Sequence, residues 1–127
     1  MNDAVETINL ETVRILHQIG VSRQIPNYFE EILSLFSTQC DGLLQDISKA
    51  IDDENHKGLK AAVHKLKGSA QSLGATSLSS HCHELQELAE LKNIDYGLAQ
   101  YISGRIQSSY EASLCLLKTK GVQDSLH

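Results

Sequence analysis

A regular spacing of apolar residues in the first half of the sequence constrains the fold of this chain more than any other feature. Successive members of the series lie alternately four and three residues apart over roughly six helical turns. This spacing places all of them on one face of an α-helix, as in the helices of a bundle. A long helix is therefore predicted over residues 26–52, with Pro26 in its first turn. Its buried face would carry Phe29, Leu33, Phe36, Cys40, Leu43, Ile47 and Ala50.

Four further helices are predicted from the same kind of pattern. Asn9 and Gly20 are suited to begin and end the first of them, because asparagine is a good N-cap and glycine a good C-terminal stop. Gly74 is the expected stop of the third helix along the chain, for the same reason. The predicted ranges are 10–19, 53–73, 76–91 and 94–118.

The connections between the last four helices are short, so consecutive helices must run antiparallel. The predicted fold class is all-α: an up-down-up-down antiparallel four-helix bundle with a short additional N-terminal helix over one end. One domain is expected over residues 9–118, with frayed termini at 1–8 and 119–127. Ser109 and Ser113 interrupt the apolar stripe of the last helix, whose buried residues are expected to be Leu98, Ile102, Ile106 and Leu117.

The overall composition excludes several classes of protein. A formal net charge of -5 argues against non-specific binding of nucleic acid. No apolar run approaches the roughly 20 residues of a membrane span, and the N-terminus lacks the basic start and apolar block of a signal peptide. We therefore expect a cytoplasmic monomer, or a domain of a larger cytoplasmic protein, without nucleic-acid or membrane partners. Its three cysteines are expected to be reduced core residues: Cys40, Cys82 and Cys115.

The charge is distributed unevenly along the chain. From Asn55 to His83 the sequence contains no aspartate or glutamate. An acidic protein with one basic patch indicates an acidic or phosphorylated partner that meets it there, although a solvated helix face would show the same charges. The basic residues of this stretch are Lys57, Lys60, Lys65 and Lys67, together with His56, His64, His81 and His83.

One stripe of the third predicted helix has the chemistry of a phosphoryl acceptor. Lys60, His64, Lys67 and Gln71 follow one another at intervals of three or four residues, so they lie on one face beside the buried stripe. A neutral imidazole is a nucleophile near pH 7, and a lysine one turn away can stabilise negative charge on a phosphoryl group. Gly68 weakens the helix but removes a side chain on the same side, which leaves room for a bulky group.

The stretch HKLKGSA, from His64 to Ala70, followed by LGA at 73–75, resembles the signature of histidine-containing phosphotransfer (HPt) domains of two-component phosphorelays. The segments PNYFEEILSLF and HCHELQELAE resemble the second and fourth helices of that family. The resemblance covers roughly residues 9–118. It implies a phosphorelay intermediate that accepts a phosphoryl group from an aspartate of one receiver domain and passes it to another receiver domain.

The resemblance also implies roles for individual residues. His64 would be the phosphorylated residue, Lys67 would stabilise the phosphoryl group, and Gly68 would leave room for it. Gln86 would hydrogen-bond near the imidazole and orient it, although many members of the family carry glutamate there.

Family membership would make the chain a phosphocarrier rather than an independent enzyme. No intrinsic cofactor is expected, because the Mg²⁺ that assists transfer belongs to the receiver domain. The expected partners are receiver domains of response regulators or of a hybrid sensor histidine kinase. Such a partner would dock on apolar residues beside His64 that come from the first two helices, with Lys60, Lys65 and Gln71 at the rim. The absence of acidic residues around His64 would complement the acidic pocket of a receiver domain.

The same sequence bears on three other functions. An autonomous histidine kinase is disfavoured, because the chain has no glycine-rich nucleotide-binding loop. A metal-binding bundle is suggested by His81 and His83, but residues two apart on a helix diverge by about 200° and cannot readily share one ion. A phosphorylation-independent adaptor bundle stays open as an additional role, although the intact His64, Lys67 and Gly68 disfavour it as the main one.

Overall fold

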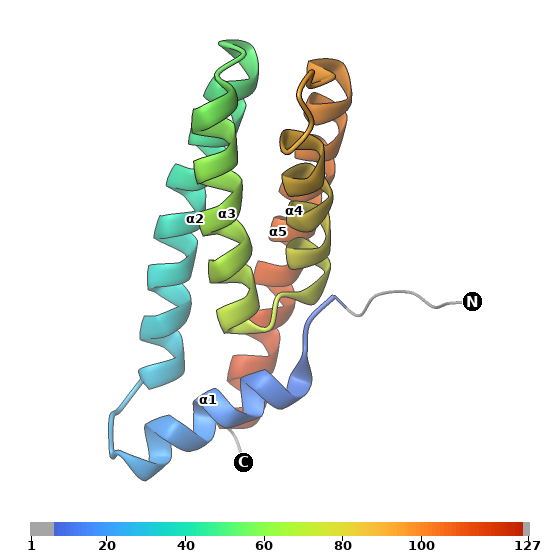
Figure 1. Ribbon diagram of the computed structural model, residues 1–127. Coiled ribbons are helices and arrows are strands. Elements are labelled where there is room, and N and C mark those ends of the chain that lie inside the picture. The colour runs from blue at the N-terminus through green and yellow to red at the C-terminus, as the bar shows by residue number, and fades with distance from the viewer. Residues whose placement is uncertain (1–6, 126–127) are drawn as a thin grey trace, which may run out of the picture.

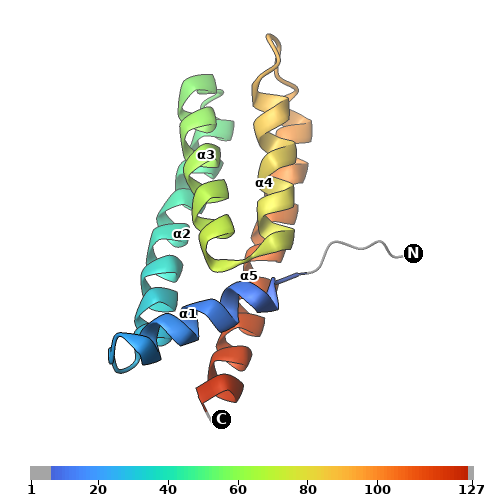
Figure 2. The ribbon, with the colours of Figure 1, turned by 60° about the horizontal axis from the view of Figure 1, so that its bottom comes forward.

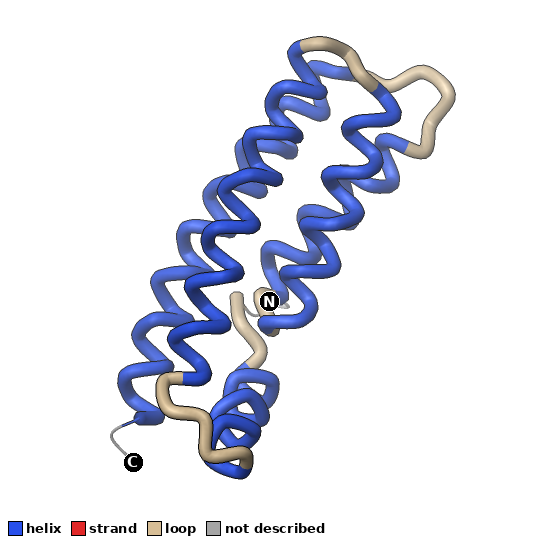
Figure 3. The backbone as a smooth tube through the Cα atoms, turned by 90° about the vertical axis from the view of Figure 1, so that its left-hand side faces the viewer, coloured by secondary structure: helices blue, strands red, loops and turns tan. Residues whose placement is uncertain are grey.

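The computed structural model describes residues 7–125, and all regular structure within that part of the chain is α-helical. Four helices alternate in direction and pack side by side as a bundle, while α1 crosses one end of it (Figures 1 and 2). Short loops join the consecutive helices of the bundle (Figure 3). The predicted fold class is confirmed, with α1 at Leu10–Ser22, α2 at Tyr28–Asp52, α3 at His56–Leu73, α4 at Thr76–Ala89 and α5 at Tyr96–Ser125.

The core lies between the four long helices, where the predicted apolar stripes meet. All seven residues of the series in α2 are buried, as the spacing predicts. The stripe of α3 is equally regular, and Leu59, Val63, Leu66 and Ala70 are fully buried. Burying a side chain such as leucine or isoleucine contributes about 1.5–3 kcal/mol to folding, so these stripes hold α2 and α3 in fixed rotation. The opposite face of α3 is thereby directed outward.

The segment before α1 is attached to the turn between α3 and α4. The backbone N–H of Asn9 donates to the carbonyl of Gly74 at 2.7 Å, and the Asn9 side chain caps α1 by accepting from the N–H of Thr12 at 3.2 Å. Ile8 is buried in the core. The predicted frayed segment 1–8 is therefore too long at its C-terminal end; its residues 1–6 lie outside the described residues.

Two predicted boundaries near the start of α2 are wrong. Gly20 does not end α1; it is a buried helical residue, and a Cβ placed there would lie 2.8 Å from the Cβ of Tyr28. The glycine therefore serves close packing of α1 against α2. Pro26 precedes α2 rather than opening it, because Asn27 takes the left-handed conformation (φ 58) before the helix begins at Tyr28.

The boundaries of α3 follow from its two caps. The helix begins at His56 rather than at residue 53, because the Asn55 side chain accepts from the N–H of Gly58 at 3.0 Å and caps it there. Its C-terminus is confirmed at Leu73, where Gly74 takes the left-handed conformation (φ 75) that favours glycine. The sharp turn at Gly74 brings α4 back alongside α3.

The packing of α5 differs most from the prediction. Leu98 is 44% exposed, and the buried residue of that turn is Ala99. Ser109 and Ser113 do not interrupt the buried stripe but belong to it, because serine is small enough to fit between packed helices. The helix also continues to Ser125, beyond the predicted end at residue 118, so the part of the predicted frayed segment 119–127 up to Ser125 is helical.

The cysteines divide into two classes. Cys40 and Cys82 are completely buried, and burial raises the pKa of each thiol to about 12, so both stay protonated and unreactive near neutral pH. Cys115 is exposed, which corrects its prediction as a core residue. None of the described helices combines the length and the apolar character that crossing a membrane would need.

Candidate functional site

The predicted phosphoryl acceptor lies on the outer face of the bundle, where α3 and α4 run side by side. His64 is exposed, as the rotation of α3 requires, and Lys67 lies one turn further along the same helix. His83 and Gln86 reach the same face from α4. These four side chains are called the α3–α4 network below.

Hydrogen bonds join the α3–α4 network into one chain. The ammonium group of Lys67 donates to Gln86 Oε1 at 3.1 Å and to His83 Nδ1 at 3.0 Å. Gln86 Nε2 donates to His64 Nδ1 at 3.3 Å. The structure thus brings Gln86 to the imidazole of His64, as predicted, while Lys67 is linked to that ring through Gln86. The two helices are connected through these bonds.

The direction of these bonds determines the tautomer of the neutral His64 ring. An ammonium group can only donate, so Gln86 must present its oxygen to Lys67 and its NH₂ group to His64. Nδ1 of His64 then accepts, and the ring proton resides on Nε2. Among the described residues, none forms a hydrogen bond with Nε2, and the side chain is exposed, so an incoming group can approach this nitrogen.

The two lysines of the stripe differ in what they contact. Lys60 forms an ion pair with Glu90 at 3.4 Å, so a carboxylate compensates its charge. Lys67 contacts an imidazole and an amide, both neutral acceptors, which hold its ammonium group without neutralising it. Its full positive charge therefore stays available to a phosphoryl group beside His64.

Gly68 faces open space one turn beyond His64. A Cβ placed there would meet no heavy atom within 4 Å, in contrast to Gly20, where the added atom would collide with Tyr28. The glycine at position 68 therefore does not serve helix packing. Because glycine has no side chain, nothing protrudes at this position beside His64.

The three predicted rim residues, Lys60, Lys65 and Gln71, are all exposed, but they do not form one cluster. Lys60 lies toward α4, whereas Lys65 lines a groove between α2 and α3.

The expectation of an acid-free surface around His64 is wrong. Glu87, in the last turn of α4, and Glu90, directly after that helix, reach this face. Both residues follow the acid-free stretch in the sequence, yet the antiparallel return of α4 places them beside α3.

His83 is a member of the site that the sequence pattern did not reveal, since it was named only within the basic stretch and in a metal-binding alternative. The ring of His81 turns instead to Glu84, with Nδ1 2.7 Å from Oε1. The described residues contain no group of three potential metal ligands. The spacing of three between His83 and Gln86 is the signal that could have placed both on the face that meets Lys67.

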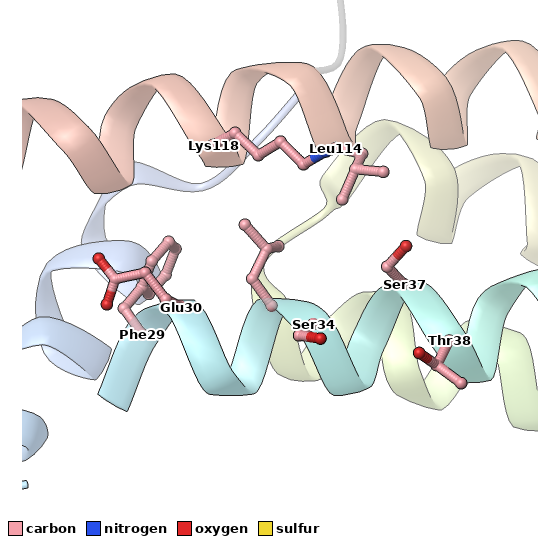
Figure 4. Close-up of a pocket in the computed structure, with 8 residues that line it drawn as sticks. Phe29, Glu30, Ser34, Ser37, Thr38, Leu114 and Lys118 are labelled. Atoms are coloured by element: carbon pink, nitrogen blue, oxygen red, sulfur yellow. The ribbon is translucent and has the colours of Figure 1, made fainter. Parts of the chain in front are cut away.

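A separate hollow of about 390 Å³ lies between α2 and α5, where side chains from the two helices point toward one another (Figure 4). No member of the α3–α4 network lines it. The hollow is lined by Phe29, Glu30, Leu33, Ser34, Ser37, Thr38, Leu114 and Lys118.

Comparison with known proteins places this geometry in a family. The model of the Hpt domain matches residues 31–112 of the chain. Histidine-containing phosphotransfer protein 2 of Arabidopsis thaliana is 34% identical over 73 residues, which are 55% of this chain and 47% of that protein. Phosphorelay intermediate protein YPD1 of Candida albicans is 29% identical over 68 residues, or 54% of this chain and 37% of that protein. The matched region therefore spans less than half the length of these relatives.

A solved structure supports the fold independently. Histidine-containing phosphotransfer protein B (HptB) of Pseudomonas aeruginosa superposes with a TM-score of 0.76 at 19% sequence identity. The superposition covers 92% of this chain and 96% of HptB. At this level of identity the likeness establishes the shared bundle.

Proposed function

This chain belongs to the Hpt domain family, and from that premise we propose that it is a phosphorelay intermediate: His64 accepts a phosphoryl group from a receiver-domain aspartate and passes it to another receiver domain. The observation that carries the proposal is the contact of an exposed imidazole with Gln86, which is itself held by Lys67. The open surface at Gly68 supports it, because a donor domain must approach within bonding distance of the ring.

The transfer step needs only a nucleophile and charge stabilisation from this chain. A lone pair of His64 attacks phosphorus, the N–P bond forms, and the P–O bond to the donor aspartate breaks. The electron pair of the broken bond leaves with the aspartate as a carboxylate. In the second transfer, a carboxylate oxygen of the aspartate in another receiver domain attacks phosphorus. A P–O bond forms, the N–P bond breaks, and its electron pair returns to the ring nitrogen of His64.

Nε2 is the nitrogen we assign to this attack, since Nδ1 is occupied by Gln86. Attack by Nε2 requires the ring proton to leave Nε2 and another proton to bind Nδ1, an exchange that the exposed ring can make with solvent water. Nδ1 would then donate a hydrogen bond, and Gln86 can accept it through Oε1 if its amide group rotates by about half a turn. This rotation breaks the hydrogen bond between Lys67 and Oε1. Phosphoryl oxygens arriving beside Lys67 would replace the lost contact, so arrival of the group and exposure of the lone pair are coupled.

The docking surface for the receiver domain is assigned to the part of α2 and α3 next to Gly68. Ser69 donates to Gln39 Oε1 of α2 at 3.0 Å, which aligns that turn of α2 with the glycine. Leu35, one turn away on α2, is 68% exposed and offers an apolar contact. Lys65 and Gln71 border this surface and Lys60 lies further toward α4. The receiver domain would supply Mg²⁺, and the chain itself would act as a cytoplasmic monomer without a cofactor or kinase activity.

A transfer experiment tests the proposal directly. The protein is mixed with a receiver domain carrying labelled phosphate in the presence of Mg²⁺, and the mixture is repeated with His64→Gln. We expect label on the wild-type chain, stable to base and labile to acid as for an N–P bond, and none on the variant. Label on His64→Gln, or none on the wild type, would overturn the proposal.

A further inference from the structure

His83 contacts the α3–α4 network at its end away from His64. Its Nδ1 lies 3.0 Å from the ammonium nitrogen of Lys67, and its Nε2 lies 3.7 Å from a carboxylate oxygen of Glu87. The side chain is 54% exposed, so burial in the core does not explain its position. Lys67 can only donate, so Nδ1 of His83 must carry a lone pair when the two groups are in contact.

We propose that His83 is a positioning residue for phosphoryl transfer: as a neutral imidazole it accepts a hydrogen bond from Lys67 and holds the ammonium group beside Gln86 and His64. This inference rests on the proposed function. His83 does not touch the reacting atoms itself; it acts through Lys67.

The physical reason is the freedom of a lysine side chain. A free lysine loses about 2 kcal/mol of rotamer entropy when it is fixed in one position. His83 and Gln86 supply two acceptors on neighbouring turns of α4, so Lys67 is held before the phosphoryl group arrives. A carboxylate could hold Lys67 equally well, but it would neutralise the charge, as Glu90 does for Lys60.

Protonation of His83 would break this arrangement. Nδ1 would then carry a proton toward Lys67, so two donors with like charge would face one another and Lys67 would have to move away. Among the described residues, the charged groups facing the ring are Lys67 from α3 and Glu87 from α4. Transfer should decline in acid for two reasons, because a protonated His64 has no lone pair for attack and a protonated His83 cannot accept a hydrogen bond from Lys67.

Two substitutions separate positioning from a merely structural role. Asparagine places Oδ1 near the position of Nδ1 and accepts a hydrogen bond at every pH, whereas alanine removes the acceptor. We expect His83→Ala to slow transfer from a saturating phosphorylated receiver about tenfold near pH 8. His83→Asn should keep the wild-type rate there and decline less steeply in acid, so that its rate relative to wild type rises as the pH falls.

The matched control is His81→Asn, which changes a histidine on the same helix that contacts Glu84 instead of Lys67. It should follow the wild-type pH profile, and thermal unfolding should confirm that all three variants are folded. The inference fails if His83→Ala transfers at the wild-type rate, if His83→Asn does not restore it, or if the rate of His83→Asn relative to wild type is independent of pH.

A measurement without a receiver domain keeps this inference separate from the proposed function. Nitrogen NMR of the isolated chain should show the proton of neutral His83 on Nε2, and Lys67→Met should shift the ring toward a mixture of tautomers. A mixture already present in the wild type would overturn the contact even if transfer to His64 occurs. If His64 accepts no label while His83 is held as described, the function fails and the contact between His83 and Lys67 stands.

Discussion

One bridge of polar side chains joins α2 to α5 and another joins α3 to α4, and the two bridges end differently. Between α2 and α5, the hydroxyl of the buried Tyr110 lies 3.1 Å from Ser37 Oγ and donates to Asp41 Oδ1 at 3.1 Å. Between α3 and α4, Lys67 and Gln86 lead to the exposed ring of His64. The first bridge ends on groups of the protein, whereas the second ends at Nδ1 of an exposed ring whose Nε2 carries no hydrogen bond from a described residue.

The two bridges also differ in how they respond to pH. Burial raises the pKa of Tyr110 above its ordinary value, so the phenol stays neutral and its contacts do not change around pH 7. The α3–α4 network contains two imidazoles, and a protonated imidazole can no longer accept the hydrogen bonds that join this network. We therefore expect the α2–α5 bridge to contribute to stability and the α3–α4 bridge to serve the proposed transfer.

The largest effect that would test this division is expected at His64. Replacing the ring with an amide in His64→Gln removes the nucleophile, so transfer should be abolished. The side chain is exposed, so the free energy of unfolding should stay unchanged in a denaturant titration. A large loss of stability in this variant would show that the α3–α4 network also holds the bundle together.

The next largest effect is expected at Lys67. Lys67→Ala should lower the maximal transfer rate at saturating donor by about tenfold to a hundredfold, because one charged donor at the transferring group is lost. The matched control is Lys60→Ala, in which the lost lysine was already paired with Glu90. It should leave the maximal rate unchanged and alter at most the donor concentration needed to reach it. Equal losses of maximal rate in both variants would contradict the distinction between the two lysines.

Tyr110→Phe should lower stability without slowing transfer, whereas the main effect of Lys67→Ala is on the transfer rate. Losing the hydroxyl should lower the free energy of unfolding by about 1–2 kcal/mol, because Ser37 and Asp41 lose their partner in a partly buried site. Transfer to His64 should be unaffected. Urea titration and the transfer assay together measure both quantities, and slower transfer in this variant would show that the two bridges are coupled.

At alkaline pH, the stability of the wild type and that of Tyr110→Phe should depend differently on pH. The pKa of Tyr110 is raised in the folded state, so its contribution to stability is complete below about pH 10, the ordinary tyrosine pKa, and is lost as the pH rises beyond it. Wild-type stability should therefore fall above that pH more steeply than the stability of Tyr110→Phe. Parallel curves for the two proteins would show that the tyrosine does not titrate differently on folding.

The sequence predicted the bundle well because its buried positions follow helical spacing closely. The series from Phe29 to Ala50 is buried without exception. The prediction failed where small residues occupy buried positions, as at Ser113 in α5, and where glycine allows close packing, as at Gly20. Hydrophobic spacing carries no signal for either case, because both depend on the partner helix.

For the site as well, the sequence predicted what depends on spacing within one helix and missed what depends on packing between helices. His64, Lys67 and Gly68 belong to one helix, and their spacing alone places them together. The part played by His83 and Glu87 depends on how α4 is aligned with α3, which tertiary packing fixes and local spacing does not. The resemblance named Gln86, but the direction of its two hydrogen bonds follows from the contact with Lys67.

The smallest effect is expected at Gly68. Substitutions there should best distinguish an effect on stability from an effect on access to His64. Added Cβ atoms at Gly68 and at Gly104 of α5 would both meet no heavy atom within 4 Å. Alanine should therefore stabilise the bundle by about 0.5–1 kcal/mol at either position, because it removes the helix penalty of glycine without strain. Denaturant titration of Gly68→Ala and Gly104→Ala should give matching gains.

Transfer should distinguish the two glycines once the side chain is larger. Gly68→Gln keeps good helix propensity but raises the surface beside His64, so it should slow transfer clearly, while Gly104→Gln leaves the rate unchanged. Gly68→Ala, with only a methyl group added, should give a rate between those of wild type and Gly68→Gln. If both glutamine variants transfer at the wild-type rate, access is not what Gly68 provides. If Gly68→Ala loses stability where Gly104→Ala gains it, the glycine at position 68 has a packing role that its open surroundings do not show.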